Sequence, residues 1–373
     1  MEACESPFDF GSRTEQLDVS HHVPGRHRSS VRVTPWAPGI GDCWSALTLQ
    51  MNHANLGQTP EWYAAITNAY GHTPLYLQAE DAKGQIAVLP AFLVRSRFFG
   101  TVVTSMPFLD AGGPLGPSAA LARGLVDSLV EAAASLGAGL VELRCTMEMA
   151  LPVPANRDKV TLVLPLPDGP DCLWKRVNAK VRNQIRKAEH SGLSVEFGGV
   201  EKLDEFYEVF SVNMRELGSP VHAQGFFSAI FDAFRDKARV ALVRKGTMPV
   251  GGLIALAFKD TLVVPWASSL REYRSFCPNM LLYWETIRTA CTAGFRRFDF
   301  GRSSRNSGTY HFKRQWGALE EPLFWYTIAI GCGRNRRLSR ADKRGILLAN
   351  LWKRLPLGFT RWFGPHIRKY LTQ

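Results

Sequence analysis

Residues Phe295–Gly317 read FRRFDFGRSSRNSGTYHFKRQWG, and the prediction of the fold starts from this stretch. Phenylalanine alternates with polar residues from 297 to 300, which predicts a short β-strand with one buried face. Gly301 is predicted to end the strand, and the seven polar residues that follow predict a loop.

The same stretch holds the residues that suggest a site. Asp299 stands at the end of the predicted strand, a loop rich in hydrogen-bond donors follows, and Lys313 lies among aromatic residues. Such a set suits a site that binds an anion and transfers a proton. A strand, a turn and a basic surface helix would show the same residue types, so both interpretations stay open.

Length and composition indicate a globular protein of several domains. The chain has 373 residues, of which 46% are hydrophobic, and this predicts two or three domains with a sizeable core. The seven cysteines are scattered and never spaced Cys-x-x-Cys, which argues against a zinc ribbon or a disulfide framework and favours a reducing compartment. Neither a signal peptide nor an apolar run of ~18 residues is apparent. We therefore expect no metal and a cytoplasmic location.

The positive charge is concentrated in residues 333–373. This tail carries eleven Lys or Arg residues and one acid, so nearly all of the net charge of +12 lies in it. Its basic residues are mixed with Trp, Phe and Leu. This mixture is typical of an amphipathic segment that binds an anionic membrane surface, here the inner face of the cell membrane. Helices packed on the body are the alternative. Because the body itself is not basic, we expect no DNA partner.

Two parts of the chain repeat one order of elements. Residues 75–145 and 239–300 each predict three strands, a loop, a long helix and a fourth strand. Such a repeat predicts a duplicated domain. The predicted divisions are a disordered arm at 1–33, an N-terminal domain at 34–168, a C-terminal domain at 169–332 and the tail at 333–373.

A basic helix is predicted between the two domains, from Leu173 to Leu193. Its apolar residues recur at intervals of three and four, and its other faces carry six Lys or Arg residues, among them Arg182 and Arg186. A solvated surface is one interpretation. The other is a cradle for phosphates of a donor or acceptor, because arginine matches phosphate geometry.

Several motifs resemble the Fem-type aminoacyl and acyl transferases, in which two domains of the GNAT acetyltransferase fold are paired. The likeness covers residues 36–330 and is greatest to a branch associated with exosortase and exopolysaccharide gene clusters. The motifs that carry it are Phe298-Asp-Phe-Gly301, Gly308-Thr-Tyr-His-Phe-Lys313, Trp316-Gly317, Gln58-Thr-Pro-Glu-Trp62, Leu89-Pro-Ala-Phe92 and Lys180-Val-Arg-Asn-Gln-Ile-Arg-Lys-Ala188.

The resemblance implies an α/β (α+β) fold of two tandem GNAT-like domains with mixed, largely antiparallel sheets, followed here by the amphipathic helical tail. It implies transfer of an acyl or aminoacyl group from an activated donor to an amine or hydroxyl. The acceptor would be a small molecule or a glycan precursor of the cell envelope or of an exopolysaccharide.

The resemblance also implies roles for individual residues. Lys313 is expected near a phosphate or a developing oxyanion, with Arg302 beside it. The requirements of acyl transfer, rather than the resemblance, suggest Asp299 as the proton carrier, with Tyr310 or His311 as alternatives, although a plain surface histidine is the simpler interpretation of His311.

One motif of ordinary GNAT enzymes is missing. After the predicted strand at 262–267, the chain has Ser268-Ser-Leu-Arg-Glu-Tyr-Arg274 in place of a glycine-rich pyrophosphate loop. The donor is therefore left open between acyl-CoA, an acyl carrier protein and an aminoacyl-tRNA. Ser268, Ser269 and Trp316 are further candidates for binding substrate.

Two other functional classes stay open from the sequence. One is a non-catalytic scaffold that binds a lipid-linked glycan at the membrane surface. The other is RNA binding through the basic helix around Arg182. Hydrolase, zinc protease and NTPase functions lack support, because the chain has no Gly-x-Ser-x-Gly, His-Glu-x-x-His or Walker motif.

Overall fold

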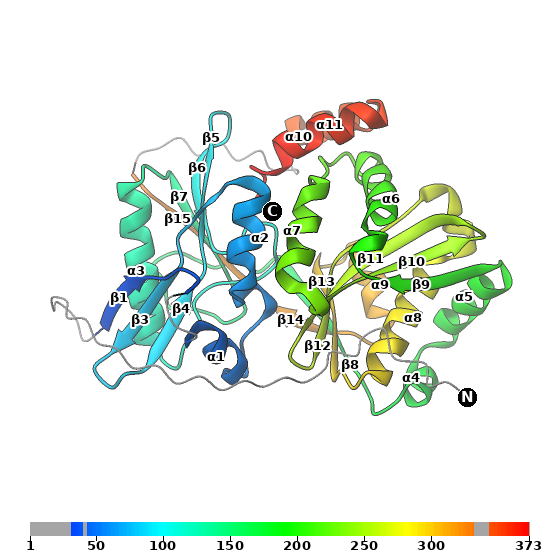
Figure 1. Ribbon diagram of the computed structural model, residues 1–373, viewed down its shortest axis with the longest axis horizontal. Helices are drawn as coiled ribbons and strands as arrows, with labels where there is room; N and C mark the ends of the chain where they lie inside the picture. The colour runs from blue at the N-terminus through cyan, green and yellow to red at the C-terminus, as the bar shows by residue number, and fades with distance from the viewer. Residues whose placement is uncertain (1–30, 40–42, 332–342, 373) are drawn as a thin grey trace. The chain divides into compact units, whose positions relative to one another are not determined.

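The computed structural model describes residues 31–39, 43–331 and 343–372, whose helices and strands are shown in Figure 1. The chain divides into two compact units. The N-terminal unit comprises the described residues up to 157, together with 322–331 and Thr372. The C-terminal unit comprises 158–321 and 343–371. Residues 1–30 of the expected disordered arm lie outside the described residues, and its last three belong to a strand, β1 (Val31–Pro35).

The N-terminal unit contains a five-stranded sheet, in the order β15-β7-β6-β5-β2, and a three-stranded sheet, in the order β1-β3-β4. The long helix α3 packs its buried leucines against the core of this unit. The other bounds are α1 (Cys43–Gln50), α2 (Glu61–Tyr70), β2 (Thr73–Pro74), β3 (Leu77–Asp81), β4 (Ile86–Leu89), β5 (Phe92–Ser96), β6 (Gly100–Thr104), α3 (Ala119–Ser135), β7 (Leu140–Cys145) and β15 (Phe324–Ala329).

The C-terminal unit contains one seven-stranded sheet, in the order β14-β8-β13-β12-β11-β10-β9. Helices α6 and α7 cover one face of this sheet, and α5 and α8 cover the other (Figure 1). The bounds are β8 (Lys159–Pro165), α4 (Pro170–Arg176), α5 (Ala179–His190), β9 (Leu193–Gly198), α6 (Leu203–Glu216), α7 (Gln224–Phe234), β10 (Ala238–Lys245), β11 (Met248–Phe258), β12 (Thr261–Ser269), α8 (Pro278–Thr292), β13 (Arg297–Ser304), α9 (Gly308–Arg314) and β14 (Leu319–Pro322).

The two units follow one plan, which confirms the predicted tandem fold. In each, two neighbouring strands are parallel and are connected through a long helix: β6 and β7 through α3, and β12 and β13 through α8. Nine further strand pairs are antiparallel, which agrees with the prediction of mixed, largely antiparallel sheets. Gly137 and Gly294 follow the two helices in the left-handed conformation, at φ 71° and 85°, which favours glycine.

The larger sheet of each unit also includes a strand that lies beyond the predicted sequence boundary. β8 follows β7 of the N-terminal unit in sequence, yet it pairs with β13 of the C-terminal unit. β15 follows the C-terminal unit in sequence, yet it pairs with β7. The division by contacts therefore differs from the sequence boundaries at 168/169 and 332/333 by these two strands.

Two predictions about elements of the C-terminal unit are wrong. Gly301 does not end its strand: β13 continues to Ser304, because a β-bulge between Asp299 and Arg302 absorbs Gly301 at φ 73°. The basic helix expected from 173 to 193 is two helices, α4 and α5. The Asn178 side chain accepts a hydrogen bond from the amide of Lys180 and so starts the second helix anew.

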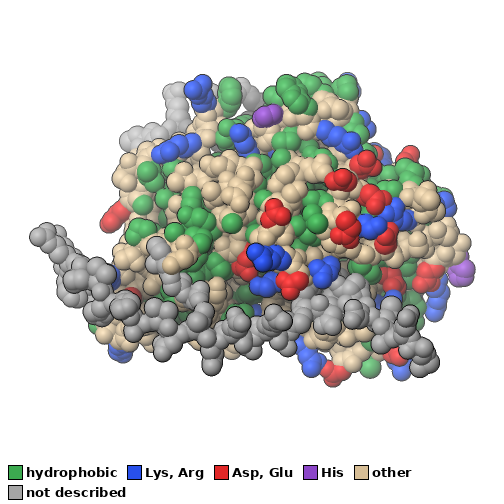
Figure 2. Space-filling view, in the orientation of Figure 1, with side chains coloured by type: hydrophobic (Ala, Val, Ile, Leu, Met, Phe, Trp, Pro, Cys, Tyr) green, Lys and Arg blue, Asp and Glu red, His purple; other side chains and the backbone are tan. Residues whose placement is uncertain are grey.

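The tail forms two helices, α10 (Lys343–Trp352) and α11 (Leu357–Arg368). One face of α11 packs against α6: Thr360 and Gly364 are buried, and Arg361 Nε donates to Ser211 Oγ at 2.7 Å. Hydrophobic side chains gather over the two helices at the top of Figure 2, where Figure 1 draws them in red. None of the helices in the described part of the chain is long and apolar enough to cross a bilayer.

Candidate functional site

In the C-terminal unit, the candidate site begins where two parallel strands separate. Thr261, Leu262 and Val263 of β12 lie opposite Arg297, Phe298 and Asp299 of β13. Beyond Asp299, β13 continues alongside β8 instead. Within the described residues, no strand pairs with the edge of β12 that faces β13 past Val263. An edge that no strand covers can receive a ligand that is extended and rich in amides.

The corresponding point in the N-terminal unit is filled by the chain itself. The parallel pairing of β6 and β7 ends at Thr104 and Glu142. The Ser105 amide then donates to the Glu142 carbonyl oxygen at 2.8 Å, and the Gly112 amide donates to the Arg144 carbonyl oxygen at 2.8 Å. The segment between β6 and α3 thus occupies the edge of β7 where the two strands separate.

Lys313 occupies the comparable position in the C-terminal unit. It lies on α9, which begins when the Ser307 hydroxyl accepts a hydrogen bond from the Tyr310 amide. Its Nζ atom donates to the carbonyl oxygens of Gly301 and Arg302, each at 2.8 Å, and the side chain is 8% exposed. Gly301 follows Asp299 by two residues, just as Arg144 follows Glu142. The second unit therefore places a buried ammonium where the first places a backbone amide.

Asp299 also binds the backbone of this bulge. Its Oδ1 atom accepts hydrogen bonds from the Gly301 amide at 2.8 Å and from the Thr161 hydroxyl at 2.6 Å. Lys313 thus holds the carbonyl of Gly301 while Asp299 holds its amide. The structure brings together Asp299, Arg302 and Lys313, three residues that the sequence predicted for one site. Thr161 was not predicted, because its place beside Asp299 depends on a strand pairing between distant segments.

The two alternative proton carriers lie on the same short helix as Lys313. The Tyr310 hydroxyl donates to the Glu320 carboxylate, and this hydrogen bond raises the pKa of Tyr310. The phenol is therefore protonated at neutral pH and acts as a donor rather than a base. His311 is exposed and its ring lies 5.3 Å from that of Tyr310.

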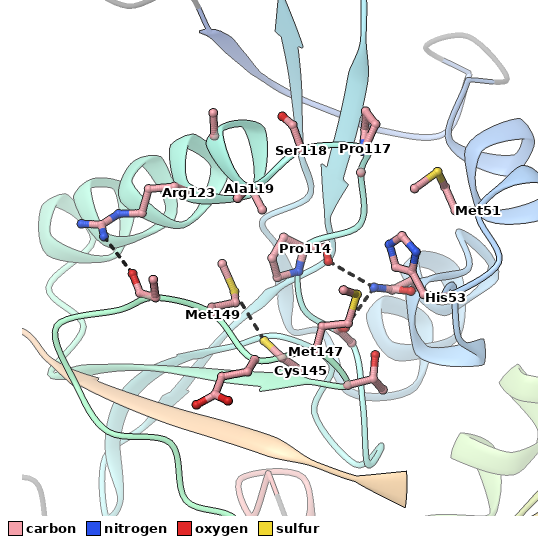
Figure 3. Close-up of a pocket in the computed structure, with 18 residues that line it drawn as sticks. Met51, His53, Pro114, Pro117, Ser118, Ala119, Arg123, Cys145, Met147 and Met149 are labelled. Carbon is pink, nitrogen blue, oxygen red and sulfur yellow. Dashed lines mark hydrogen bonds between the residues drawn. The ribbon is translucent and has the colours of Figure 1, made fainter.

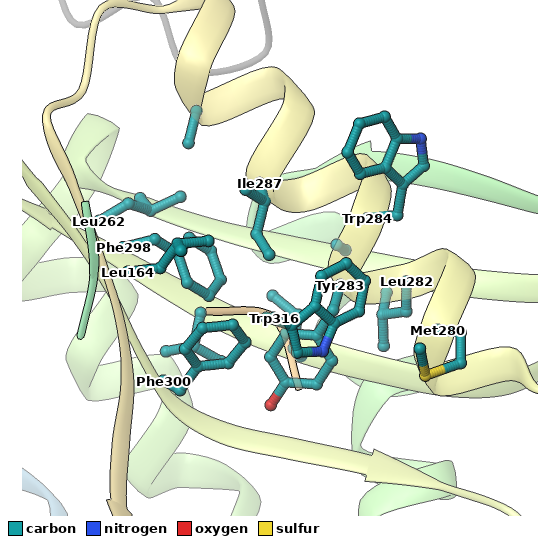
Figure 4. Close-up of a cluster of buried hydrophobic side chains, with 14 of the residues drawn as sticks. Leu164, Leu262, Met280, Leu282, Tyr283, Trp284, Ile287, Phe298, Phe300 and Trp316 are labelled. Atoms are coloured by element: carbon teal, nitrogen blue, oxygen red, sulfur yellow. The ribbon is translucent and has the colours of Figure 1, made fainter. Parts of the chain in front are cut away.

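Trp316 lies in an aromatic cluster beneath the bulge. Figure 4 shows Trp316 beside Tyr283 and Phe300 in the core between α8 and the sheet. Trp316 is 3% exposed, and its indole N–H has no hydrogen-bond partner among the described residues. A buried donor without a partner costs free energy, so this N–H is a group that a bound polar atom would satisfy.

The remaining predicted residues are held by contacts within the C-terminal unit. The buried Ser268 hydroxyl donates to Asn213 Oδ1 at 3.2 Å, and Asn213 Nδ2 donates to the Ser269 carbonyl oxygen at 3.2 Å. These bonds join the end of β12 to α6.

Arg182 and Arg186 both contact the end of α4. Arg182 donates to the carbonyl oxygens of Trp174 and Val177, which supplies hydrogen-bond donors to carbonyl groups at the end of that helix. The Arg186 guanidinium lies 5.5 Å from the centre of the Trp174 ring. Arg182 thus has a structural role, and the phosphate cradle stays a prediction.

The N-terminal unit has a cavity of about 560 Å³ that sequence reasoning missed, shown in Figure 3. It lies between the start of α3 and the segment after β7, and its wall is largely apolar and rich in sulfur atoms. Burial raises the pKa of the Cys145 thiol in this wall to about 12, so the thiol is not a nucleophile at neutral pH. The labelled lining residues are Met51, His53, Pro114, Pro117, Ser118, Ala119, Arg123, Cys145, Met147 and Met149.

No sequence motif marks this cavity, because its wall comes from several separate segments. Among the residues that the structure describes, no three His, Cys, Asp or Glu side chains gather closely enough to hold a metal ion.

Comparison with known proteins agrees with this architecture. Residues 175–314 match a family described as the Acetyltransferase (GNAT) domain. A search of curated proteins finds no match. The structure is similar to that of FemX, with a TM-score of 0.61 and 15% identity over 79% of this chain and 97% of FemX.

Two further structures are similar at lower scores. The C-terminal domain of an Agrobacterium fabrum protein described as a lysylphosphatidylglycerol synthetase gives a TM-score of 0.53, with 12% identity over 77% of this chain and 90% of that one. A tandem GNAT protein from the clavulanic acid biosynthesis pathway gives 0.52, with 12% identity over 81% of this chain and 99% of that one. These likenesses show the tandem GNAT fold, and the family match identifies the chain as an acyltransferase.

Proposed function

We propose that this acyltransferase moves an acyl or aminoacyl group to an amine or hydroxyl of a cell-envelope or exopolysaccharide precursor, and that the C-terminal unit carries the reaction. The separation of β12 from β13 beside the buried Lys313 is the observation that carries this proposal. The same position in the N-terminal unit is filled by backbone. The family match, which covers residues 175–314, also falls in the C-terminal unit.

Acyl transfer needs a held donor carbonyl, a deprotonated nucleophile and a stabilised oxyanion. In this proposal the Lys313 ammonium, with Arg302 beside it, stabilises the oxyanion or a nearby phosphate. A buried charge acts strongly because little water screens it. Asp299 takes up the proton of the attacking group, since its carboxylate and the Lys313 ammonium both bind the backbone of Gly301.

The start of α8 is the feature from which we choose the donor, and it favours a carrier protein or an aminoacyl-tRNA over free coenzyme A. Ordinary GNAT enzymes hold a pyrophosphate on a glycine-rich loop at the equivalent place. This chain has the short helical turn Arg271–Phe276, and Pro278 at the first position of α8 removes one amide donor. The edge of β12 past Val263 suits an extended, amide-bearing arm, which both a carrier protein and coenzyme A present, so the start of α8 is the feature that favours the carrier protein.

The acceptor class follows from the resemblance of the motifs to the exosortase and exopolysaccharide branch. The A. fabrum relative is named for attaching lysine to a phospholipid, and it shares the fold. We carry only the class of transferred group, an aminoacyl group, from that name to this proposal.

The test is transfer of labelled groups from a panel of donors: acetyl-CoA, an acylated carrier protein and charged tRNA. Mass spectrometry of ligands that copurify with the full-length chain would choose the acceptors to supply. We expect transfer from at least one donor and its loss in Lys313→Ala. Transfer that persists in Lys313→Ala would remove Lys313 from the site. Donor binding that maps to the N-terminal unit would overturn the choice of unit.

A further inference from the structure

The two tail helices present an apolar face that the C-terminal unit does not cover. Its large side chains are between 37% and 70% exposed, with Leu347 at 70% and Trp362 at 66%. The aromatic members touch one another: the rings of Phe359 and Phe363 lie 5.5 Å apart, and those of Trp362 and Phe363 lie 6.0 Å apart. The face consists of Ile346, Leu347, Leu348, Leu351, Phe359, Trp362 and Phe363.

The opposite face of α11 fixes this orientation. Thr360, Gly364 and Arg368 recur every four residues, so they share one side of the helix. A side chain at Gly364 would meet the Val221 amide at 3.0 Å, and Arg368 Nε donates to His222 Nε2 at 3.0 Å. These contacts involve the side of α11 that carries Thr360, Gly364 and Arg368. Rotating the aromatic side of α11 toward the C-terminal unit would therefore break them.

α10 is held in a similar way. A side chain at Gly218 would collide with the Ala349 carbonyl oxygen at 2.5 Å, so the backbone of α10 lies directly against the end of α6. Leu347, Leu348 and Leu351 lie away from this contact and are exposed. The two helices therefore form one surface with its apolar side chains outward.

The charge of the tail indicates which kind of partner would bind this face. Residues 343–372 include seven Lys or Arg and no Asp or Glu. Two copies of this surface would bring like charges together, which disfavours self-association. The surface combines exposed apolar side chains, including a Trp and two Phe, with many cations. This combination is typical of segments that bind at the headgroup boundary of a bilayer containing anionic lipid.

We propose that the face of α10 and α11 docks the protein on an anionic lipid surface, with Phe359, Trp362 and Phe363 inserted at the headgroup boundary. The helices lie in the plane of the surface and do not cross it. The basic side chains Lys353 and Arg354, which are exposed between the helices, contact the lipid phosphates. This docking does not depend on the proposed acyl transfer.

The test is cosedimentation of the full-length protein with vesicles of phosphatidylglycerol and phosphatidylcholine, against vesicles of phosphatidylcholine alone. We expect binding to the anionic vesicles that weakens with salt. The variant Phe359→Ser/Trp362→Ser should lower the partition coefficient at least about tenfold, because each aromatic side chain loses its burial in lipid. Lys353→Gln/Arg354→Gln should weaken binding and reduce its dependence on salt.

Phe98→Ser is the matched control, because Phe98 is 86% exposed and lies in the N-terminal unit. It should leave vesicle binding unchanged. Equal binding of wild type and Phe359→Ser/Trp362→Ser would overturn the proposal. So would light scattering that shows a dimer split by this variant, because the face would then join two copies of the chain.

Discussion

At the scale of single residues, the candidate site is built around one glycine. Lys313 holds the carbonyl oxygen of Gly301, and Asp299 accepts a hydrogen bond from its amide. The sequence placed both residues in one site from their types and from a motif. It did not predict that Lys313 would be buried and bound to backbone, because that depends on how α9 returns to the bulge of β13.

Lys313→Ala should abolish transfer and leave the fold in place. It also leaves two carbonyl oxygens of the bulge without their charged donor, so the free energy of unfolding should fall by about 1–3 kcal/mol. Transfer assays and urea unfolding measure the two effects. Lys83→Ala, which removes an exposed lysine in the turn after β3 of the N-terminal unit, should change neither. An unstable but fully active Lys313→Ala protein would assign Lys313 a purely structural role.

His222 should make stability depend on pH. Burial and the nearby Arg368 cation hold the pKa of His222 well below its usual value. Below pH ~6.5 the unfolded chain binds a proton at His222 that the folded chain does not. Above that pH, this group should therefore not affect the free energy of unfolding. As the pH drops further, the free energy of unfolding should decrease by at most about 1.4 kcal/mol per pH unit.

Urea unfolding at several pH values between neutral and mildly acidic tests this expectation. His222→Gln should flatten the acid side of the profile, and His366→Gln, at an exposed position of α11, should not. Parallel profiles for wild type and His222→Gln would show that other groups cause the acid loss.

At the scale of elements, the bulge in β13 decides the geometry of the site. The sequence predicted that Gly301 ends the strand, since glycine and polar residues commonly mark a loop. β13 continues because β8 offers it an antiparallel partner on the far side of the bulge. In the same way, Asn178 divides the predicted basic helix into α4 and α5, although the apolar period continues across it.

Gly301→Ala should destabilise the protein by about 1 kcal/mol, because φ 73° is strained for alanine. It should also lower transfer, since it moves a carbonyl that Lys313 binds. Gly308→Ala is the control: it lies at the start of α9 with open space around the new methyl group, and it should be neutral or slightly stabilising. Equal effects of both substitutions on unfolding and transfer would argue against a strained bulge.

At the scale of the whole molecule, the larger sheet of each unit contains a strand that lies beyond the predicted sequence boundary. The apolar residues Val160, Leu162 and Leu164 of β8 are buried in the core of the C-terminal unit. A fragment that starts at the sequence boundary, 169–373, lacks this strand. A fragment that starts at 158 retains it.

The fragment 158–373 should therefore unfold cooperatively, and 169–373 should not, because the latter exposes one side of β13 and the apolar core beneath it. Thermal unfolding followed by circular dichroism, with solubility as a second readout, compares the two. Equal behaviour would show that β8 is dispensable and would support the sequence boundary as a domain boundary.

The sequence by itself determined the local elements, their repetition in two halves and the concentration of charge in the tail. Each of these depends on residues that are near one another in the chain, where a period of two or about 3.6 shows directly. Only the tertiary structure decided which distant segments lie side by side. Thr161 reaches Asp299 across 138 residues of sequence, β15 returns to β7, and Lys313 meets the bulge of β13. Such pairings arise from the burial of whole sheet faces, and no local pattern records which strand will supply them.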